Sequence, residues 1–184
     1  MSCSISKGRA INCKDQIGGL KTAWLMDFGG LGTVTLGSND EATDASGTGT
    51  LFQYDLKGSG NTMETTANVS RDNGTSFFST VLSLSLPKLT KEDQKELKLL
   101  SYQRLAIIVE DRNGNFFLLG KDHGCELTSA SMQTGGGFSD ASQYVMEFSS
   151  EEALPPNFVD GATAANPTAG WSSYTETITV GTNS

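Results

Sequence analysis

The residues most capable of catalytic chemistry lie around the single histidine of the chain. His123 and Cys125 are separated by one residue in the segment Lys-Asp-His-Gly-Cys. Such a pair could form a nucleophilic centre, in which the imidazole takes the thiol proton and leaves a reactive thiolate. The sequence offers no evident third group to orient the imidazole, and alternation along a strand places residues two apart on one side without any function. We therefore expect no catalytic residue and no enzymatic activity.

The same residues also suggest a zinc site. Cys3, Cys13, His123 and Cys125 provide the right number of ligands, but the closely spaced cysteine pair that is usual in structural zinc sites is missing. The odd number of cysteines favours a reducing compartment over a disulfide framework. Neither a phosphate-binding loop nor a complete dinucleotide fingerprint is present. We therefore expect no metal and no cofactor.

The carboxylates show no acid–base arrangement, but their distribution is uneven. The chain has 13 basic and 21 acidic residues, for a net charge of −8, and every Lys and Arg lies within residues 1–121. Residues 122–184 contain only acidic charges, and the adjacent Glu151 and Glu152 are expected to form a solvated pair. Two interpretations stay open: an acidic surface that keeps the protein in solution, or a surface along which DNA passes without sticking.

The elements that must position these residues are mainly strands. Alternation of apolar and polar residues predicts about nine of them, and the clearest are 61–71 and 75–86, joined at an Asn-Gly turn into a long amphipathic hairpin. One helix is expected over residues 91–103, with Thr90 as its N-cap. The predicted fold is mainly β with one helix (α+β): an antiparallel sandwich or barrel with a flanking helix, long hairpins and extended arms.

The domain organisation follows from composition. We expect an N-terminal arm over 1–19, a β-sandwich or barrel domain over 20–159, and an acidic linker with a last strand over 160–184. Residues 37–50 contain no aromatic or large apolar side chain, which predicts a long polar contact loop. No apolar run approaches the roughly 20 residues of a membrane span, and the first residues lack a hydrophobic signal region. These features predict a soluble protein that stays where it is made or enters a particle built there.

Short motifs spread over residues 8–159 resemble the tail tube proteins of long-tailed bacteriophages. They are structural motifs: Gly-Arg at 8–9, Cys-Lys-Asp at 13–15, Gly-Gly-Leu-Lys at 18–21, Ser-Arg-Asp-Asn-Gly-Thr at 70–75 with Phe-Phe at 77–78, Val-Glu-Asp-Arg-Asn-Gly-Asn at 109–115, and Glu-Glu-Ala-Leu-Pro-Pro-Asn-Phe-Val at 151–159.

The resemblance implies a virion protein, made in the cytoplasm of the bacterial host, that binds copies of itself and other tail proteins. Six copies would form a ring, and stacked rings would form a tube whose negative channel conducts DNA as passing cargo during ejection, with no membrane partner for the isolated protein. Two elements compete to line the channel, the Lys- and Arg-free segment through Glu126, Asp140 and Glu147, and the long hairpin through Glu64, Thr66 and Asn68.

Contacts between rings would come from the arm and the polar loop, through Lys14, Asp15, Asp40, Glu41 and Asp44. Two other classes of protein remain open from the residues alone. One is a different virion component, such as a capsid decoration or head–tail connector protein, and the other is a monomeric β-barrel module that binds a ligand in a cavity.

Overall fold

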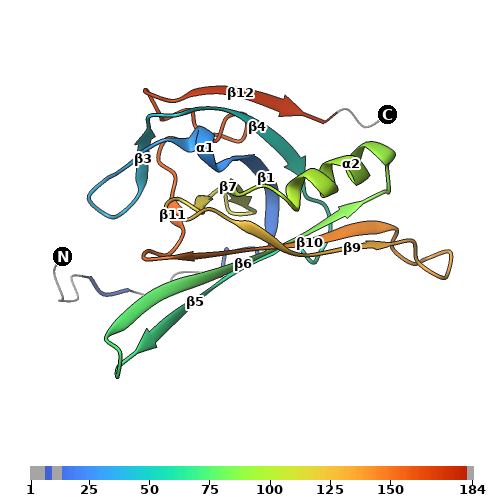
Figure 1. The fold of residues 1–184 in the computed structure, drawn as a ribbon, viewed down its shortest axis with the longest axis horizontal. Coiled ribbons are helices and arrows are strands. Elements are labelled where there is room, and N and C mark those ends of the chain that lie inside the picture. Colours follow the sequence, from blue (N-terminus) through green and yellow to red (C-terminus); the bar gives the residue numbers. More distant parts are fainter. Residues whose placement is uncertain (1–6, 10–13, 182–184) are drawn as a thin grey trace.

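The computed structural model describes residues 7–9 and 14–181, so that the zinc candidates Cys3 and Cys13 lie outside the described residues. Two β-sheets make up most of it (Figure 1). The first sheet has six strands in the order β11 (Asn157–Phe158), β8 (Phe116–Leu119), β7 (Leu105–Asp111), β1 (Leu20–Asp27), β4 (Thr48–Asp55) and β12 (Thr175–Val180). The second has four strands in the order β5 (Thr62–Ser70), β6 (Thr75–Pro87), β10 (Gln143–Glu152) and β9 (Glu126–Gln133).

The two sheets pack face to face around the main hydrophobic core. Leu25 and Ile107 of the six-stranded sheet meet Leu82, Leu84 and Phe148 of the four-stranded sheet, and all five side chains are buried. Period-two alternation places these residues on the inner faces, because successive strand residues point to opposite sides. The expected mainly-β, antiparallel sandwich is confirmed, with one exception in that β12 pairs with β4 in parallel.

A second core lies on the opposite face of the six-stranded sheet. Trp24 and Ile108 are fully buried there, under Trp171 and Tyr174 from the segment that precedes β12. The Trp171 indole Nε1 donates a hydrogen bond of 3.2 Å to the carbonyl oxygen of Ala42. The hydrophobic core therefore continues past residue 159, where we expected the main domain to end.

The polar stretch 37–50 is more regular than we expected. Together β2 (Val34–Leu36) and β3 (Ala42–Ala45) form a two-stranded ribbon, and β4 already begins at Thr48. Ala42 and Ala45 are fully buried, although their small side chains give no apolar signal in the sequence. Only residues 37–41 and 46–47 of the predicted loop lie outside strands.

The described residues form two helices where the sequence predicted one. The expected helix, α2, spans Lys91–Leu100 and ends three residues earlier than predicted. Its N-cap is as expected, because the Thr90 hydroxyl accepts a hydrogen bond from the Asp93 N–H. The second helix, α1, is the single turn Phe28–Leu31, in which the Asp27 carboxylate accepts the Gly29 N–H.

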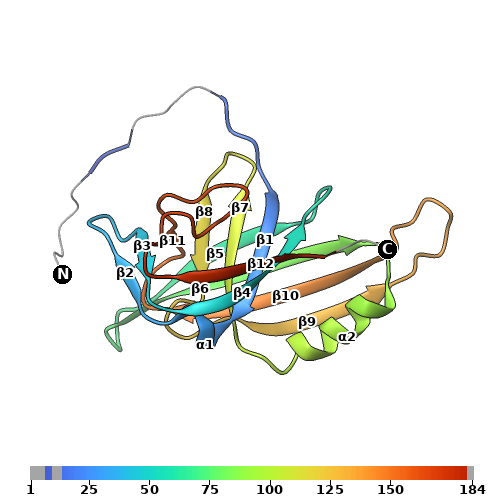
Figure 2. The ribbon, with the colours of Figure 1, turned by 90° about the horizontal axis from the view of Figure 1, so that it is seen from above.

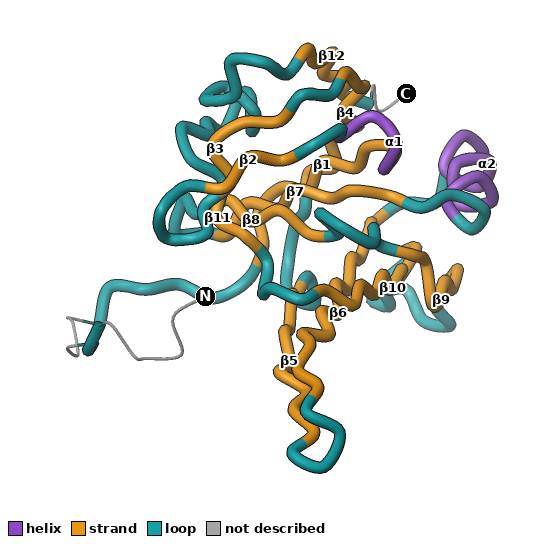
Figure 3. Tube along the Cα trace, turned by 60° about the vertical axis from the view of Figure 1, so that its left-hand side comes forward, coloured by secondary structure: helices purple, strands orange, loops and turns teal. Residues whose placement is uncertain are grey.

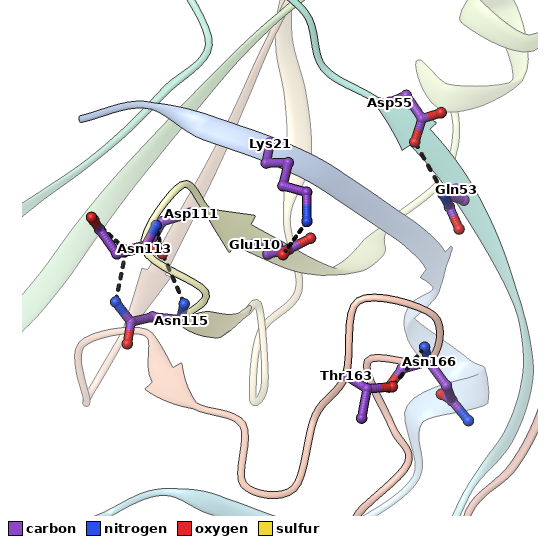
Figure 4. Close-up of polar contacts among 9 residues, drawn as sticks. All are labelled: Lys21, Gln53, Asp55, Glu110, Asp111, Asn113, Asn115, Thr163 and Asn166. Carbon is purple, nitrogen blue, oxygen red and sulfur yellow. Dashed lines mark hydrogen bonds and ion pairs between the residues drawn. The ribbon is translucent and has the colours of Figure 1, made fainter. Parts of the chain in front are cut away.

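The end of the N-terminal arm is fixed to the β7–β8 turn, whose Asp111, Asn113 and Asn115 side chains are drawn in Figure 4. The Asp111 carboxylate accepts the backbone N–H groups of Asn113 and Asn115, each at 2.8 Å, and so holds the Asn-Gly turn closed. The Asn113 side chain then exchanges two hydrogen bonds of 2.9 Å with the backbone of Ile17. This contact explains how β1 enters the sheet directly after a polar, glycine-containing lead-in.

Candidate assembly surface

The outer face of the four-stranded sheet is the most distinctive surface of the molecule. Alternation turns Met63, Leu82 and Met146 toward the core, so that the residues between them point outward. One row of residues paired across adjacent strands contains Glu64 on β5, Val81 on β6, Ser149 on β10 and Glu126 on β9. The neighbouring rows read Thr62–Ser83–Glu147–Ser129 and Thr66–Ser79–Glu151.

This face carries exposed carboxylates and small hydroxyl side chains. Glu64, Glu147 and Glu151 are exposed on it, and no Lys or Arg belongs to β5, β6, β9 or β10. Glu126, at the β9 edge, lies 3.6 Å from Arg104, which precedes β7, and both side chains are more than half exposed. An exposed pair of this kind is weak, so the field over the face remains negative.

The two elements that competed as channel lining are parts of one surface. Because β6 pairs with both β5 and β10, Glu64, Thr66 and Asn68 share a sheet face with Glu147 and, through β9, with Glu126. Local alternation predicts which residues of a strand share a side, but it does not predict that these two strands have a common neighbour.

Asp140 does not join this face. It lies in the loop between β9 and β10, where its carboxylate accepts the N–H groups of Gly137 at 2.6 Å and Gly136 at 2.9 Å. These hydrogen bonds, that from Gly137 first, hold the pKa of Asp140 below its usual value. Asp140 therefore fixes the conformation of this loop.

Glu151 is an exposed member of the acidic face, although it was not among the residues predicted to line the channel. The prediction of a solvated pair at 151 and 152 is wrong, because Glu152 is turned inward and buried. Its carboxylate accepts the N–H groups of Asp122 and His123 at 2.9 to 3.2 Å. The alternation through Tyr144, Met146 and Phe148, continued four residues further, places Glu152 on the buried side and Glu151 on the exposed side.

Both edges of the four-stranded sheet are open. Within the described part of the chain, β5 pairs only with β6, and β9 pairs only with β10. Nearly every side chain of β9 is exposed. Open edges present unpaired N–H and C=O groups, which makes them templates for strands of another chain.

The residues predicted to contact other rings lie in different surroundings. Lys14 and Asp15 are exposed at the described end of the arm. Asp40 has a positive φ of 61° in the β2–β3 turn, and the Glu41 carboxylate accepts the backbone N–H of Asn39 at 2.7 Å.

Asp44 binds the chain's own C-terminal segment. It accepts the Ser173 N–H at 3.0 Å and the hydroxyls of Ser172 and Ser173. The backbone hydrogen bond from Ser173 and then its hydroxyl lower the pKa of Asp44. Its carboxylate is therefore already occupied within one molecule.

His123 and Cys125 do not form a nucleophilic pair. His123 is exposed, whereas Cys125 is 1% exposed in the core, and burial raises the pKa of its thiol to about 12. A neutral thiol of this kind is a poor nucleophile and a poor metal ligand. Among residues 7–9 and 14–181, no group of three or more His, Cys, Asp and Glu side chains is arranged to hold a metal ion.

A groove and a small pocket lie beside the four-stranded sheet. An open groove of about 660 Å³ lies near the end of β10, lined by both polar and apolar groups, including Phe77, Arg104, His123 and Glu151. A pocket beside Leu118 and Pro155 holds only about 10 Å³, roughly the space of one water molecule.

Comparison with family models, with curated proteins and with solved structures finds no match for this chain. Within the described ranges, no helix is long and apolar enough to cross a membrane. The features of the molecule that bear on function are therefore the acidic face, its open edges and the motifs of the sequence.

Proposed function

We propose that this chain is a virion structural protein that assembles into stacked rings to form a phage tail tube, through which DNA is ejected. The observation that carries the proposal is the outer face of the β5–β6–β10–β9 sheet, which is acidic, has no Lys or Arg and ends in two open edges. The resemblance of the sequence motifs to tail tube proteins supports the same function.

The open edges suit closure into a larger sheet. All neighbouring strands of the four-stranded sheet are antiparallel, so β5 and β9 run in opposite directions. When β5 of one copy lies beside β9 of the next, the antiparallel alternation continues across the boundary. A ring of copies then forms one closed barrel, which satisfies the edge groups and removes the edges.

The chemistry of the face suits a channel for DNA. Proteins that hold DNA neutralise its phosphates with Lys and Arg, and these contacts supply most of the non-specific affinity. A wall of Glu64, Glu147 and Glu151 among serines and threonines offers no such contact. It repels the phosphates, so that DNA moves along the channel without being retained.

Negative-stain electron microscopy of the concentrated protein tests the proposal. Hollow tubes would support it, isolated rings would favour a connector or decoration protein, and single particles of about the chain mass of 19.5 kDa would contradict self-assembly. Met132→Lys, which adds a charge to the β9 edge away from the acidic face, is expected to prevent tubes. Val180→Lys is the matched control, because it adds the same charge to the edge strand of the other sheet.

A further inference from the structure

We propose a contact between copies of this chain that follow one another along the tube axis. This inference rests on the proposed tube. The hairpin tip (residues 69–77) of one copy packs against the β9–β10 loop (residues 134–142) of the next. Neither turn has a function in the ring closure described above, and each segment exposes apolar side chains that the single molecule leaves in water.

The hairpin tip projects beyond the body of the sheet (Figure 3). Pairing between β10 and β6 stops at Glu152 and Phe78, so the residues nearer the turn pair only across the hairpin. Val69 is 74% exposed and Phe77 is 38% exposed, on opposite faces of this ribbon. A two-stranded ribbon has little stability of its own in water, so an extension with exposed apolar groups points to a partner.

The β9–β10 loop presents its apolar group in a fixed conformation. Phe138 is fully exposed. The loop that carries it is closed by the two hydrogen bonds from Gly136 and Gly137 to Asp140 and by a third, of 3.1 Å, from the Asp140 N–H to the Gly137 carbonyl. An aromatic ring held in water by an ordered turn is suited to act as an anchor in an interface.

These two segments lie at opposite ends of the same sheet, as both views of the ribbon show (Figures 1 and 2). The hairpin turn meets β6 at Thr75, whereas the β9–β10 loop lies beside Pro87, at the other end of this 13-residue strand. The strand is roughly 40 Å long, so the two segments of one molecule cannot meet. A second copy that is displaced along the strand direction can place its β9–β10 loop beside the hairpin tip of the first copy.

The charges of the two segments are compatible with this contact. The turn carries Arg71, which belongs to none of the ion pairs of the described residues, followed by Asp72. The loop carries Asp140 and has no basic residue. Each copy contributes its hairpin tip to the contact with one neighbour and its β9–β10 loop to the contact with another. The contact is therefore heterologous and repeats from copy to copy without closing.

Cross-linking between two variants tests the contact. Asp72→Cys and Ser139→Cys are made in a background with Cys3 and Cys13 replaced by serine, while the buried Cys125 stays unreactive. After assembly of the mixture, a short bismaleimide is expected to join the two variants into a dimer, and neither variant alone should form that species. Assembled tubes that yield no mixed dimer would overturn the inference and leave the proposed tube intact.

Phe138→Ser tests the energetic importance of the loop. We expect the critical concentration for tube formation to rise roughly tenfold or more, because the transfer of a phenyl ring out of water is lost. Tyr102→Ser is the matched control, since Tyr102 is a 77% exposed aromatic residue outside both segments. Equal effects of the two variants, or rings that stack normally with Phe138→Ser, would contradict the contact. Failure of the unsubstituted protein to form rings would overturn the proposed function as well.

Discussion

Glu64 and Glu126 stand at the two ends of one row that crosses the entire four-stranded sheet, through Val81 and Ser149. One carboxylate therefore lies on each open edge, where the proposed ring brings neighbouring copies together. In that ring, a carboxylate would lie on each side of every boundary between subunits.

Lysine on this face should slow the passage of DNA without preventing assembly. We expect phage that carry the double variant Glu147→Lys, Glu151→Lys, with both lysines on the inner strand β10, to form tails of normal length but to eject DNA several times more slowly, because each lysine adds a phosphate contact. Ejection is measured by the release of DNA in the presence of receptor, at several salt concentrations. The deficit should shrink as salt rises, because screening weakens the added contacts.

The control for that experiment is a charge change away from the face. Asp160→Lys alters the net charge by the same amount per site, at an exposed position after β11. Normal ejection with the double variant, or an equal delay with Asp160→Lys, would show that the acidic face does not line the channel.

The thiol of Cys125 should be inert in the folded protein. Burial raises its pKa from 9.0 to about 12, which lowers the thiolate fraction near pH 8 roughly a thousandfold. In a background with Cys3 and Cys13 replaced by serine, we expect a thiol reagent to modify Cys125 only after denaturation. Rapid modification under native conditions would restore the nucleophile hypothesis for His123 and Cys125.

The Lys21–Glu110 ion pair should be important for stability (Figure 4). Their side chains are 2.7 Å apart, the Glu110 side chain is 4% exposed, and its second oxygen, Oε2, has no hydrogen-bond partner. Lys21→Met leaves a buried carboxylate unpaired, and we expect it to lower the free energy of unfolding by about 2–3 kcal/mol, less than for a fully buried pair because Lys21 is half exposed.

Urea unfolding measures this loss. Lys57→Met, which removes an exposed lysine, should change the free energy of unfolding by less than about 0.5 kcal/mol. The double variant Lys21→Met, Glu110→Leu should recover most of the stability, since it removes the buried charge as well. A double variant as unstable as Lys21→Met would argue that packing of the lysine stem, rather than the charge, is responsible.

Acid should release the segment before β12 through Asp44. The pKa of this carboxyl is lowered in the folded state, so its contribution to stability is present above the ordinary pKa of 3.8 and is lost as the pH falls through the lower, folded value. Asp44→Ala should remove that acid dependence and speed hydrogen exchange in β12. Exchange across β12 that is unchanged by Asp44→Ala would contradict a role for the Ser172 and Ser173 contacts.

The sequence predicted the elements with strong local signals. The Asn-Gly turn between β5 and β6 and the Thr90 cap of α2 were found because each depends on a few adjacent residues. The β2–β3 ribbon was missed because Ala42 and Ala45 bury little surface and leave no large apolar pattern. The parallel pairing of β12 with β4 and the common face of Glu64 and Glu147 depend on contacts between distant strands, which alternation within a strand does not encode.

The burial of Trp171 against Trp24 and Ile108 also has a consequence for biosynthesis. β1 and β7 are translated about 60 residues or more before Trp171, so the part of this core that Trp171 covers stays exposed in a nascent chain until late in translation. The four-stranded sheet, complete by residue 152, forms its open edges earlier. A chaperone that shields this part of β1 and β7 would therefore act during this interval, before the chain is complete.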